Sequence, residues 1–333
     1  MPGQEEVQKV IEQLYILGFE KNLGDMDLVK KVVVNSGHVD VTLASASMGE
    51  DTKEKIRKTV TIAASKVAGV NSVDVEFVAA TEGINNVKNV IAIMSGKGGV
   101  GKSLVSSLTA VALRRAGREV GIMDADITGP SIPRMFGITD RPVGDETGLN
   151  PVKSRSGIAI MSINLLLPDE NEAVVWRGPL IARAISQFWE EVRWGNLDYL
   201  VVDLPPGTAD APLTVLQSLP VSGIIMVSTP QELTSMVVRK AINMAQRMNK
   251  PILGVVENMS YLYVPEIKKK IEIFGRSRGN EMALAVGSPL LAQLPIDPAL
   301  AKLCDEGKIE DYESEEVAAF GSALLKVLPK AER

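Results

Sequence analysis

Hydrophobic and polar residues follow two different periods along the first 80 residues of the chain. Apolar residues recur at helical spacing in residues 7–17 and 56–67, and they form the short or alternating runs of strands in residues 32–34, 39–43 and 73–77. The segment Asn35-Ser36-Gly37 between the first two strands is typical of a hairpin. The pattern predicts a small α-β-β-α-β domain over residues 1–80.

A polar segment, residues 81–88, follows as a predicted linker, and residues 89–333 then alternate between apolar strands and amphipathic helices. Such alternation predicts an α/β domain with a mainly parallel sheet that helices cover on both faces. Its ligand is expected at the carboxyl ends of the strands. The expected strands are residues 89–94, 119–123, 158–163, 199–202, 224–227 and 252–256, and the expected helices are residues 103–116, 179–192, 233–248 and 315–327.

A glycine-rich segment lies between the first strand and the first helix of this larger domain. It reads Gly96-Lys97-Gly98-Gly99-Val100-Gly101-Lys102-Ser103 and matches G-x-x-x-x-G-K-[ST] in the strand–loop–helix context that this motif requires. Backbone N–H groups of the loop would surround a polyphosphate, Lys102 would reach the terminal phosphates and Ser103 would ligate Mg²⁺. The segment therefore predicts a nucleoside triphosphate site.

Polar side chains at the ends of three further strands agree with this prediction. Asp124 and Asp126 follow one strand, Asp203 ends another before Leu-Pro-Pro-Gly-Thr, and Asn258 ends a third. A carboxylate such as Asp203 can hold Mg²⁺ while the Pro/Gly loop after it responds to the γ-phosphate. The amide of Asn258 is able to contact a base edge.

Composition narrows the classes of partner and compartment. The net charge of −5 argues against nucleic acid as the main partner, and no segment is long and apolar enough to span a membrane. The acidic start of the chain and its one cysteine, Cys304, favour a cytoplasmic protein without a signal peptide or a disulfide. The one histidine, His38, is interpreted as a solvated turn residue because no other histidine or cysteine could pair with it as a ligand.

The glycine-rich segment resembles the deviant Walker A loop of the MinD/ParA/nitrogenase-reductase group of dimeric ATPases. Within that group, the chain resembles the Mrp (ApbC-type) iron–sulfur cluster carriers, and residues 1–80 resemble the small α/β domain often fused before them. The resemblance rests on residues 124–133 (DADITGPSIP), 176–179 (WRGP), 203–210 (DLPPGTAD), 254–261 (GVVENMSY) and 293–298 (QLPIDP).

The resemblance implies a role for each matching residue. Lys97 would reach the nucleotide of the facing subunit, so that ATP hydrolysis would depend on a face-to-face homodimer. Asp203 would be the Walker B acid, Asp124 would support Mg²⁺, and Asp126 would orient the attacking water. Adenine contacts are implied for Asn258, Pro295 and Asp297.

The chain departs from the Mrp pattern at the residues that hold the cluster. Mrp carriers usually have Cys-x-x-Cys soon after the ENMS segment, whereas residues 261–268 contain no cysteine. The usual Cys-Pro of the front domain is also missing from residues 45–50, and Val237 replaces an acid that the family often carries. Cys304, on a predicted short helix, is interpreted as a buried structural residue.

Two hypotheses remain. The first is an ATP-hydrolysing carrier or accessory factor in iron–sulfur cluster assembly, whose cluster ligands would include other groups or a partner's residues. The second is a nucleotide-dependent dimerisation switch that binds other proteins and carries no cluster, as MinD and ParA do. A lipid surface is not expected as its partner, because the amphipathic segment 313–328 begins with acids and is expected to dock on the core.

Overall fold

The computed structural model describes residues 3–16, 22–26, 28–44, 50–78, 85–126, 129, 131–145, 148–167, 178–207, 210–231, 240, 242–245 and 247–331, with backbone only at residues 50, 51, 178–182 and 210. Two compact units make up the chain. The first holds residues 1–85 with the short segments 143–150 and 189–193, and the second holds the rest.

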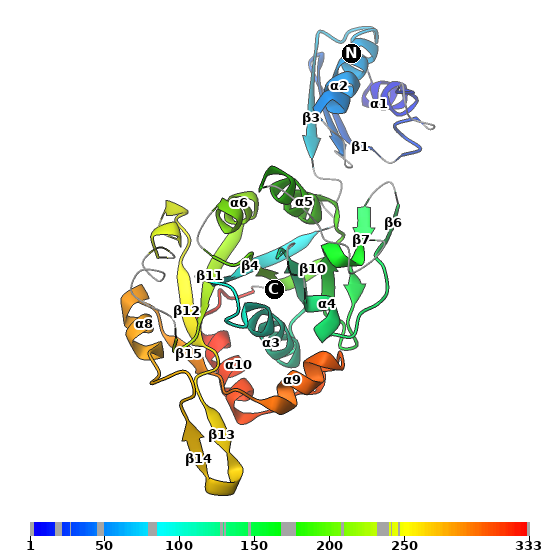
Figure 1. The fold of residues 1–333 in the computed structure, drawn as a ribbon. Coiled ribbons are helices and arrows are strands. Elements are labelled where there is room, and N and C mark those ends of the chain that lie inside the picture. The colour runs from blue at the N-terminus through cyan, green and yellow to red at the C-terminus, as the bar shows by residue number, and fades with distance from the viewer. Residues whose placement is uncertain are drawn as a thin grey trace. The chain divides into compact units, whose positions relative to one another are not determined.

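The N-terminal unit has the predicted α-β-β-α-β order (Figure 1). In its sheet, β1 and β2 are antiparallel and β2 and β3 are parallel. The β1–β2 turn has positive φ at both Ser36 (51°) and Gly37 (88°), which is the geometry that two-residue hairpins require. The elements are α1 Gln4–Glu12, β1 Val29–Asn35, β2 His38–Ala44, α2 Glu50–Ala64 and β3 Ser72–Val78.

One face of this small sheet is buried and the other is open. Val39, Val41 and Leu43 alternate along β2 and pack with apolar residues of both helices, including Ile11 and Val60. Because side chains alternate across a strand, the residues between them point to the opposite, more exposed face. The core of this unit is thus a single layer between sheet and helices.

The second unit is built on an eight-stranded sheet in the order β15-β12-β11-β4-β10-β5-β9-β8. All neighbouring pairs are parallel except β8 and β9. Figure 1 shows α5 and α6 on one face of the sheet and α3 and α10 on the other, which confirms the predicted α/β class. The strands are β4 Asn86–Ser95, β5 Val120–Asp124, β8 Val152–Lys153, β9 Ala159–Ser162, β10 Asn196–Asp203, β11 Val221–Ser228, β12 Ile252–Glu257 and β15 Leu290–Gln293.

The helices and the smaller elements alternate with the strands of the large sheet along the chain. The α-helices are α3 Lys102–Arg115, α4 Ile132–Met135, α5 Gly178–Glu191, α6 Asp210–Ser218, α8 Gly279–Val286, α9 Pro298–Asp305 and α10 Glu315–Val327. Two small antiparallel hairpins pair β6 Val143–Asp145 with β7 Gly148–Asn150, and β13 Leu262–Val264 with β14 Lys269–Ile271. Among the described helices, none is long and apolar enough to cross a bilayer.

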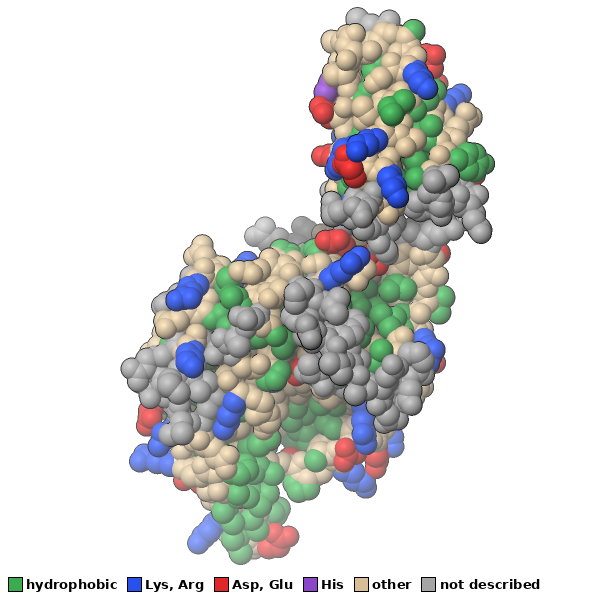
Figure 2. Space-filling view, turned by 45° about the horizontal axis from the view of Figure 1, so that its top comes forward, with side chains coloured by type: hydrophobic (Ala, Val, Ile, Leu, Met, Phe, Trp, Pro, Cys, Tyr) green, Lys and Arg blue, Asp and Glu red, His purple; other side chains and the backbone are tan. Residues whose placement is uncertain are grey.

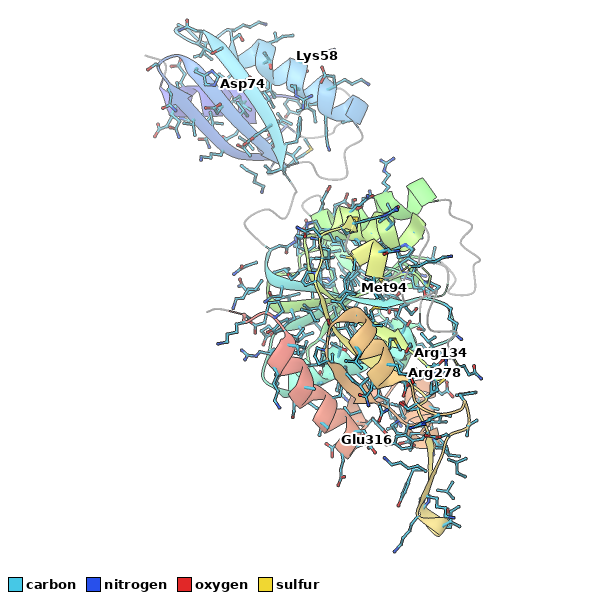
Figure 3. All side chains as sticks on the ribbon, turned by 90° about the vertical axis from the view of Figure 1, so that its left-hand side faces the viewer. Lys58, Asp74, Met94, Arg134, Arg278 and Glu316 are labelled. Atoms are coloured by element: carbon cyan, nitrogen blue, oxygen red, sulfur yellow. The ribbon has the colours of Figure 1, made fainter. Side chains whose placement is uncertain are left out.

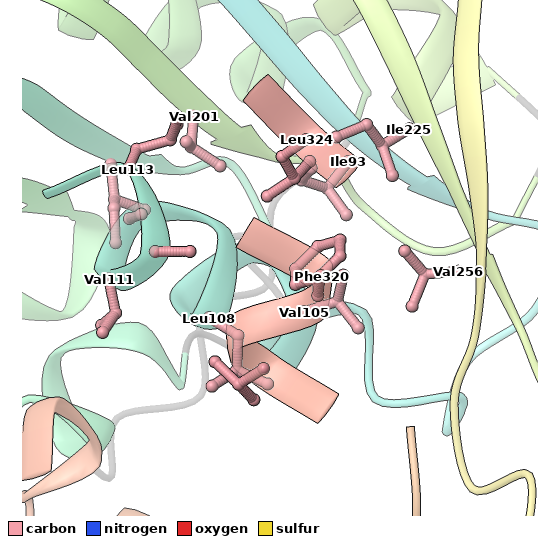
Figure 4. Packing of buried hydrophobic residues seen from close by; sticks show 14 of the residues in the cluster. Ile93, Val105, Leu108, Val111, Leu113, Val201, Ile225, Val256, Phe320 and Leu324 are labelled. Atoms are coloured by element: carbon pink, nitrogen blue, oxygen red, sulfur yellow. The ribbon is translucent and has the colours of Figure 1, made fainter. Parts of the chain in front are cut away.

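The core beside the P-loop helix joins α3, α10 and the sheet (Figure 4). Leu108 of α3, Phe320 of α10 and Ile93 of β4 are all fully buried. Burying such a side chain contributes about 1.5–3 kcal/mol each. A Cβ on Gly321 would lie 3.2 Å from the Ala112 Cβ, so small residues let the two helices approach closely. This packing fixes the helix whose first turn carries Lys102 and Ser103.

Several predictions of element bounds need adjustment. Strand β4 begins at Asn86, within the segment predicted as a linker, and pairs with β10 from Asn196 onward. His38 lies in β2 and not in the turn before it. The predicted helix 233–248 and the segments at residues 45–49, 127–128 and 176–177 lie mostly or wholly outside the described residues.

Candidate nucleotide site

The site forms where three neighbouring parallel strands end. The register pairs Asp203 of β10 with Ile93 of β4 on one side and with Asp124 of β5 on the other. Two of the sequence-predicted acids therefore end adjacent strands, at the edge of the sheet where the glycine-rich loop leaves β4. A parallel sheet gathers such residues because all its strands finish at the same edge.

The glycine-rich loop adopts a backbone that only glycine allows without strain. Gly99 and Gly101 have φ of 79° and 80°. A Cβ on Gly99 would meet no atom within 4 Å, and residues 97–99 are exposed, so this part of the loop is open to solvent. A Cβ on Gly101 would instead clash with Asn258 Nδ2. The loop leads into α3 at Lys102, so the positive end of a 14-residue helix faces the space beside it.

Asp203 is the centre of the polar network at this edge, and it is fully buried. Ser103 Oγ donates to its Oδ2 at 2.5 Å, and Ser106 Oγ donates to its Oδ1 at 2.6 Å. Lys102 Nζ lies 2.8 Å from the same Oδ1 as an ion pair. The three predicted residues Lys102, Ser103 and Asp203 are thus in direct contact.

Asp124 and Asp126 add two more carboxylates to the network. Asp124 is fully buried and accepts hydrogen bonds from Ser162 Oγ at 3.1 Å and from the Asp126 backbone N–H at 3.3 Å. Its burial, and then the nearby charge of Asp203, raise the pKa of Asp124 to about 8. Asp126 Oδ2 lies 3.5 Å from Lys102 Nζ. One lysine therefore faces two carboxylates, with a third behind them.

The residues present fit a phosphate group and Mg²⁺. Lys102 Nζ is buried and makes no well-aligned hydrogen bond to any described residue, although it is paired electrostatically with Asp203. A phosphate oxygen would supply that missing acceptor. Ser103, Asp203 and Asp124 offer the hard oxygen ligands that Mg²⁺ prefers, and a cation there would counteract the burial and the Asp203 charge that raise the pKa of Asp124.

Lys97 and the loop after Asp203 lie on the outer side of the glycine-rich segment. The Lys97 side chain is exposed, while its backbone carbonyl accepts from Ser95 Oγ at 3.0 Å. The N–H of Gly207 donates to the Ser95 carbonyl at 3.0 Å, and a Cβ on Gly98 would be 3.9 Å from the Pro206 Cβ. The Pro/Gly loop is thus beside the P-loop, where the sequence analysis expected it.

The residues predicted to contact adenine are brought near the P-loop, but with other partners. Asn258 is buried, and its Nδ2 donates to the Val100 carbonyl at 2.9 Å, so it braces the loop. The segment that contains Pro295 is held beside Asn258 by a hydrogen bond from Leu294 N to the Glu257 carbonyl. Asp297 caps α9 through Ala299 N at 2.8 Å and accepts from Tyr312 Oη at 2.6 Å.

Two contributors escaped the sequence analysis. Ser106 is three residues after Ser103, and this helical spacing, which places both hydroxyls on one face of α3, was an available signal. Glu257 is fully buried and accepts hydrogen bonds from Ser260 Oγ, Ser277 Oγ and Arg278 N at 2.8, 2.6 and 2.7 Å. It ties the segment after β14 to the strand end that carries Asn258, and no sequence signal identified its partners.

The chain's one cysteine lies outside this network. Cys304 is half-buried on α9, where it packs against the core cluster. Burial raises the pKa of its thiol to about 11. The region that follows Asn258 forms the β13–β14 hairpin, on and beside which Tyr263, Ile267, Ile271 and Ile273 are exposed. Figure 2 shows hydrophobic side chains gathered over this part of the molecule.

Comparison with protein families gives two matches along the chain. Residues 86–328 match the ParA family model described as the NUBPL iron-transfer P-loop NTPase. Residues 4–77 match a model described as an iron–sulfur cluster assembly protein. Each match covers one of the two α/β regions that the hydrophobic pattern separates.

Curated relatives and solved structures agree with these matches. The chain is 44% identical to the iron–sulfur cluster carrier protein of Clostridium perfringens over 238 residues, which are 69% of this chain and 84% of the relative. It is 35% identical to that of Helicobacter pylori over 321 residues, which are 92% of this chain and 86% of the relative.

A nucleotide-binding protein from Archaeoglobus fulgidus, solved in complex with ADP, is 44% identical, with a TM-score of 0.64 over 71% of this chain and 93% of that chain. The cell division ATPase MinD of Pyrococcus furiosus is 22% identical, with a TM-score of 0.52 over 73% of this chain and all of that chain. This second likeness shows the shared fold.

Proposed function

Because the chain belongs to the NUBPL-type family of iron-transfer P-loop NTPases, we propose that it binds Mg²⁺ and ATP and hydrolyses the ATP slowly, as a cytoplasmic homodimer that serves iron–sulfur cluster assembly or transfer. The observation that carries this proposal is the contact of Lys102, Ser103 and Asp203 at the open glycine-rich loop. The relative solved with ADP supports a nucleotide as the ligand.

The proposed roles follow from charge and position. Lys102 and the loop N–H groups would bind the phosphates, and Ser103, Asp203 and Asp124 would hold Mg²⁺, which would supply positive charge beside the transferred phosphoryl group. Asp126, which is less buried than Asp203, orients the attacking water. Asn258 and the segment from Pro295 to Asp297 line the adenine side.

The exposed side chain of Lys97 supports a dimeric mechanism. Its own site already has Lys102 as a buried cation, so a second lysine on the outer side of the loop is free to reach the nucleotide of a facing subunit. A cation supplied in this way would complete the site only when two subunits meet. The rate of ATP hydrolysis would then depend on the fraction of the protein that is dimeric.

We propose that an iron–sulfur cluster is transferred by this chain as a substrate, and that cysteine thiolates of this chain are not its only ligands. An iron–sulfur cluster normally takes four cysteine ligands, whereas two subunits would offer only two copies of Cys304. The raised pKa of that thiol also disfavours the thiolate that a metal needs. Ligands from a client or assembly partner are therefore part of the proposal.

Anaerobic reconstitution of the purified chain tests the proposal. Iron and sulfide would be counted per dimer with and without a thiol-bearing acceptor protein, and ATP hydrolysis would be followed in parallel. We expect stable iron and sulfide only when the acceptor is present. ATP hydrolysis without any cluster under either condition would instead support the cluster-free dimerisation switch.

A further inference from the structure

A histidine and two aspartates meet on the open face of the N-terminal sheet, in a part of the chain that the nucleotide site does not use. His38 and Asp40 are two residues apart on β2, so they share one face. The parallel register sets His38 opposite Ser72 and Asp40 opposite Asp74 on β3. Figure 2 shows purple and red side chains next to each other at the surface of this unit, and Figure 3 labels Asp74 on the sheet and Lys58 on α2.

The three side chains converge on one ring nitrogen. His38 Nε2 lies 3.0 Å from Asp40 Oδ1 and 3.3 Å from Asp74 Oδ2. One donor atom from each residue lies within 4.8 Å of the other two. For metal–ligand bonds of about 2.1 Å, donors in tetrahedral or octahedral sites stand roughly 3.0–3.4 Å apart. The two distances from His38 Nε2 to the carboxylate oxygens, 3.0 and 3.3 Å, lie within that range.

Ser72 orients the imidazole through its other nitrogen. His38 Nδ1 and Ser72 Oγ are 2.7 Å apart. In the tautomer that donates Nδ1–H to the hydroxyl, Nε2 presents a lone pair to two carboxylates. Lone pairs that converge in this way require a proton or a cation between them. A ligating histidine that donates its second ring nitrogen to a polar partner is the usual arrangement in metal sites.

We propose that His38, Asp40 and Asp74 bind one divalent first-row transition-metal ion, such as Zn²⁺ or Fe²⁺, and that Ser72 is a positioning residue for the imidazole. One imidazole with two carboxylates suits these ions, whereas Mg²⁺ and Ca²⁺ prefer oxygen ligands alone. The side chains of His38, Asp40 and Asp74 are 39%, 51% and 80% exposed, so water completes the coordination and the ion enters without opening the fold.

The proposed site differs from one prediction made from the sequence. His38 was not expected to be a ligand because the chain has no second histidine and only one cysteine. In the proposal, carboxylates take the place of those ligands, and one of them comes from a strand 34 or more residues away along the chain. The competing interpretation is a protonated histidine that bridges two aspartates without a metal.

Zinc titration of the full chain, saturated with Mg²⁺ and ADP to occupy the nucleotide site, tests the proposal. Calorimetry should give one Zn²⁺ per chain, and the signal of the chain's single histidine ring should shift with the same titration. His38→Gln and Asp74→Asn should each weaken binding at least about tenfold, and Ser72→Ala by about tenfold. Thermal melts of each variant would establish that the unit remains folded.

Glu76→Gln is the matched control. Glu76 is on the same strand and face as Asp74, but its Oε1 accepts from Thr42 Oγ1 at 2.9 Å, and it lies outside the three donors. The Glu76→Gln substitution removes one negative charge, as Asp74→Asn does, and should leave zinc affinity unchanged. A histidine signal that does not respond to Zn²⁺, or equal affinity in His38→Gln, would overturn the proposal in favour of the protonated bridge. An equal loss of zinc affinity in Glu76→Gln would show that binding depends only on general surface charge, and this result would also overturn the proposal.

Discussion

Lys102, in the first turn of α3, forms a buried ion pair with Asp203 at the end of β10, with Nζ and Oδ1 2.8 Å apart. The proposed phosphate-binding cation and the proposed Mg²⁺ ligand thus neutralise each other, since two isolated charges at this depth would be costly. Binding of Mg²⁺ and a nucleotide would replace this contact by two stronger ones, from lysine to phosphate and from carboxylate to metal.

Lys102→Ala should lower ATP affinity by at least about 100-fold, because a buried cation–phosphate contact is lost and three acids remain near the phosphates. Equilibrium titration with a fluorescent ATP analogue would measure it. Lys88→Ala is the control, since Lys88 pairs with Asp198 elsewhere on the sheet. Unchanged affinity in Lys102→Ala would refute the site.

Lys97→Ala should leave ATP binding within a few-fold of the original but reduce hydrolysis on the order of 10³-fold, as expected for a cation supplied in trans. Light scattering with and without ATP would show whether the Lys97→Ala protein also fails to form ATP-dependent dimers. Hydrolysis at the original rate, or dimers that form equally well, would remove Lys97 from the facing-subunit role.

Asp126→Ala should slow hydrolysis on the order of 10²-fold or more while ATP stays bound, because the water loses the carboxylate that orients it. We expect an ATP-bound dimer to accumulate, detectable by size and by the nucleotide retained after gel filtration. Asp140→Ala, at an exposed position, is the control for the loss of one acid. Normal turnover in Asp126→Ala would contradict the assignment.

Cys304 should react slowly with thiol reagents in the folded protein. Burial raises its pKa to about 11, so the thiolate fraction at pH 8 is lower folded than unfolded, where the group has its ordinary value near 9. The rate of labelling should therefore rise when denaturant is added at constant pH, and should rise in the folded protein only as the pH approaches 11. Rapid labelling at pH 7 would indicate an exposed, activated thiolate instead.

Phe320→Ala should destabilise the second unit by about 3–5 kcal/mol, since the ring is fully buried between α10 and α3. Denaturant unfolding would measure the free energy. Leu325→Ala, on the same helix but 43% exposed, should cost far less. Equal losses would mean that α10 packs differently from Figure 4.

Residues close together in the sequence determined the glycine-rich loop and most of the helices and strands of the large sheet. The glycine loop and its lysine and serine are adjacent in sequence, so the candidate phosphate site can be predicted without a structure. Helix α10 has the predicted bounds, residues 315–327, because its apolar period and its Ser314 cap are local. Six of the eight strands of the large sheet were predicted as continuous apolar runs, since parallel strands are buried on both faces, whereas the short edge strands β8 and β15 were not predicted.

The tertiary structure alone decided which of these elements meet. Ser106 reaches Asp203 across 97 residues, and Asn258 reaches Val100 across 158, and in each case the strand order brings the partners together. His38 gains Asp74 in the same way, through the register of β2 and β3. Periodicity specifies which face a residue occupies, but the partner on that face depends on sheet order and register, which long-range packing determines.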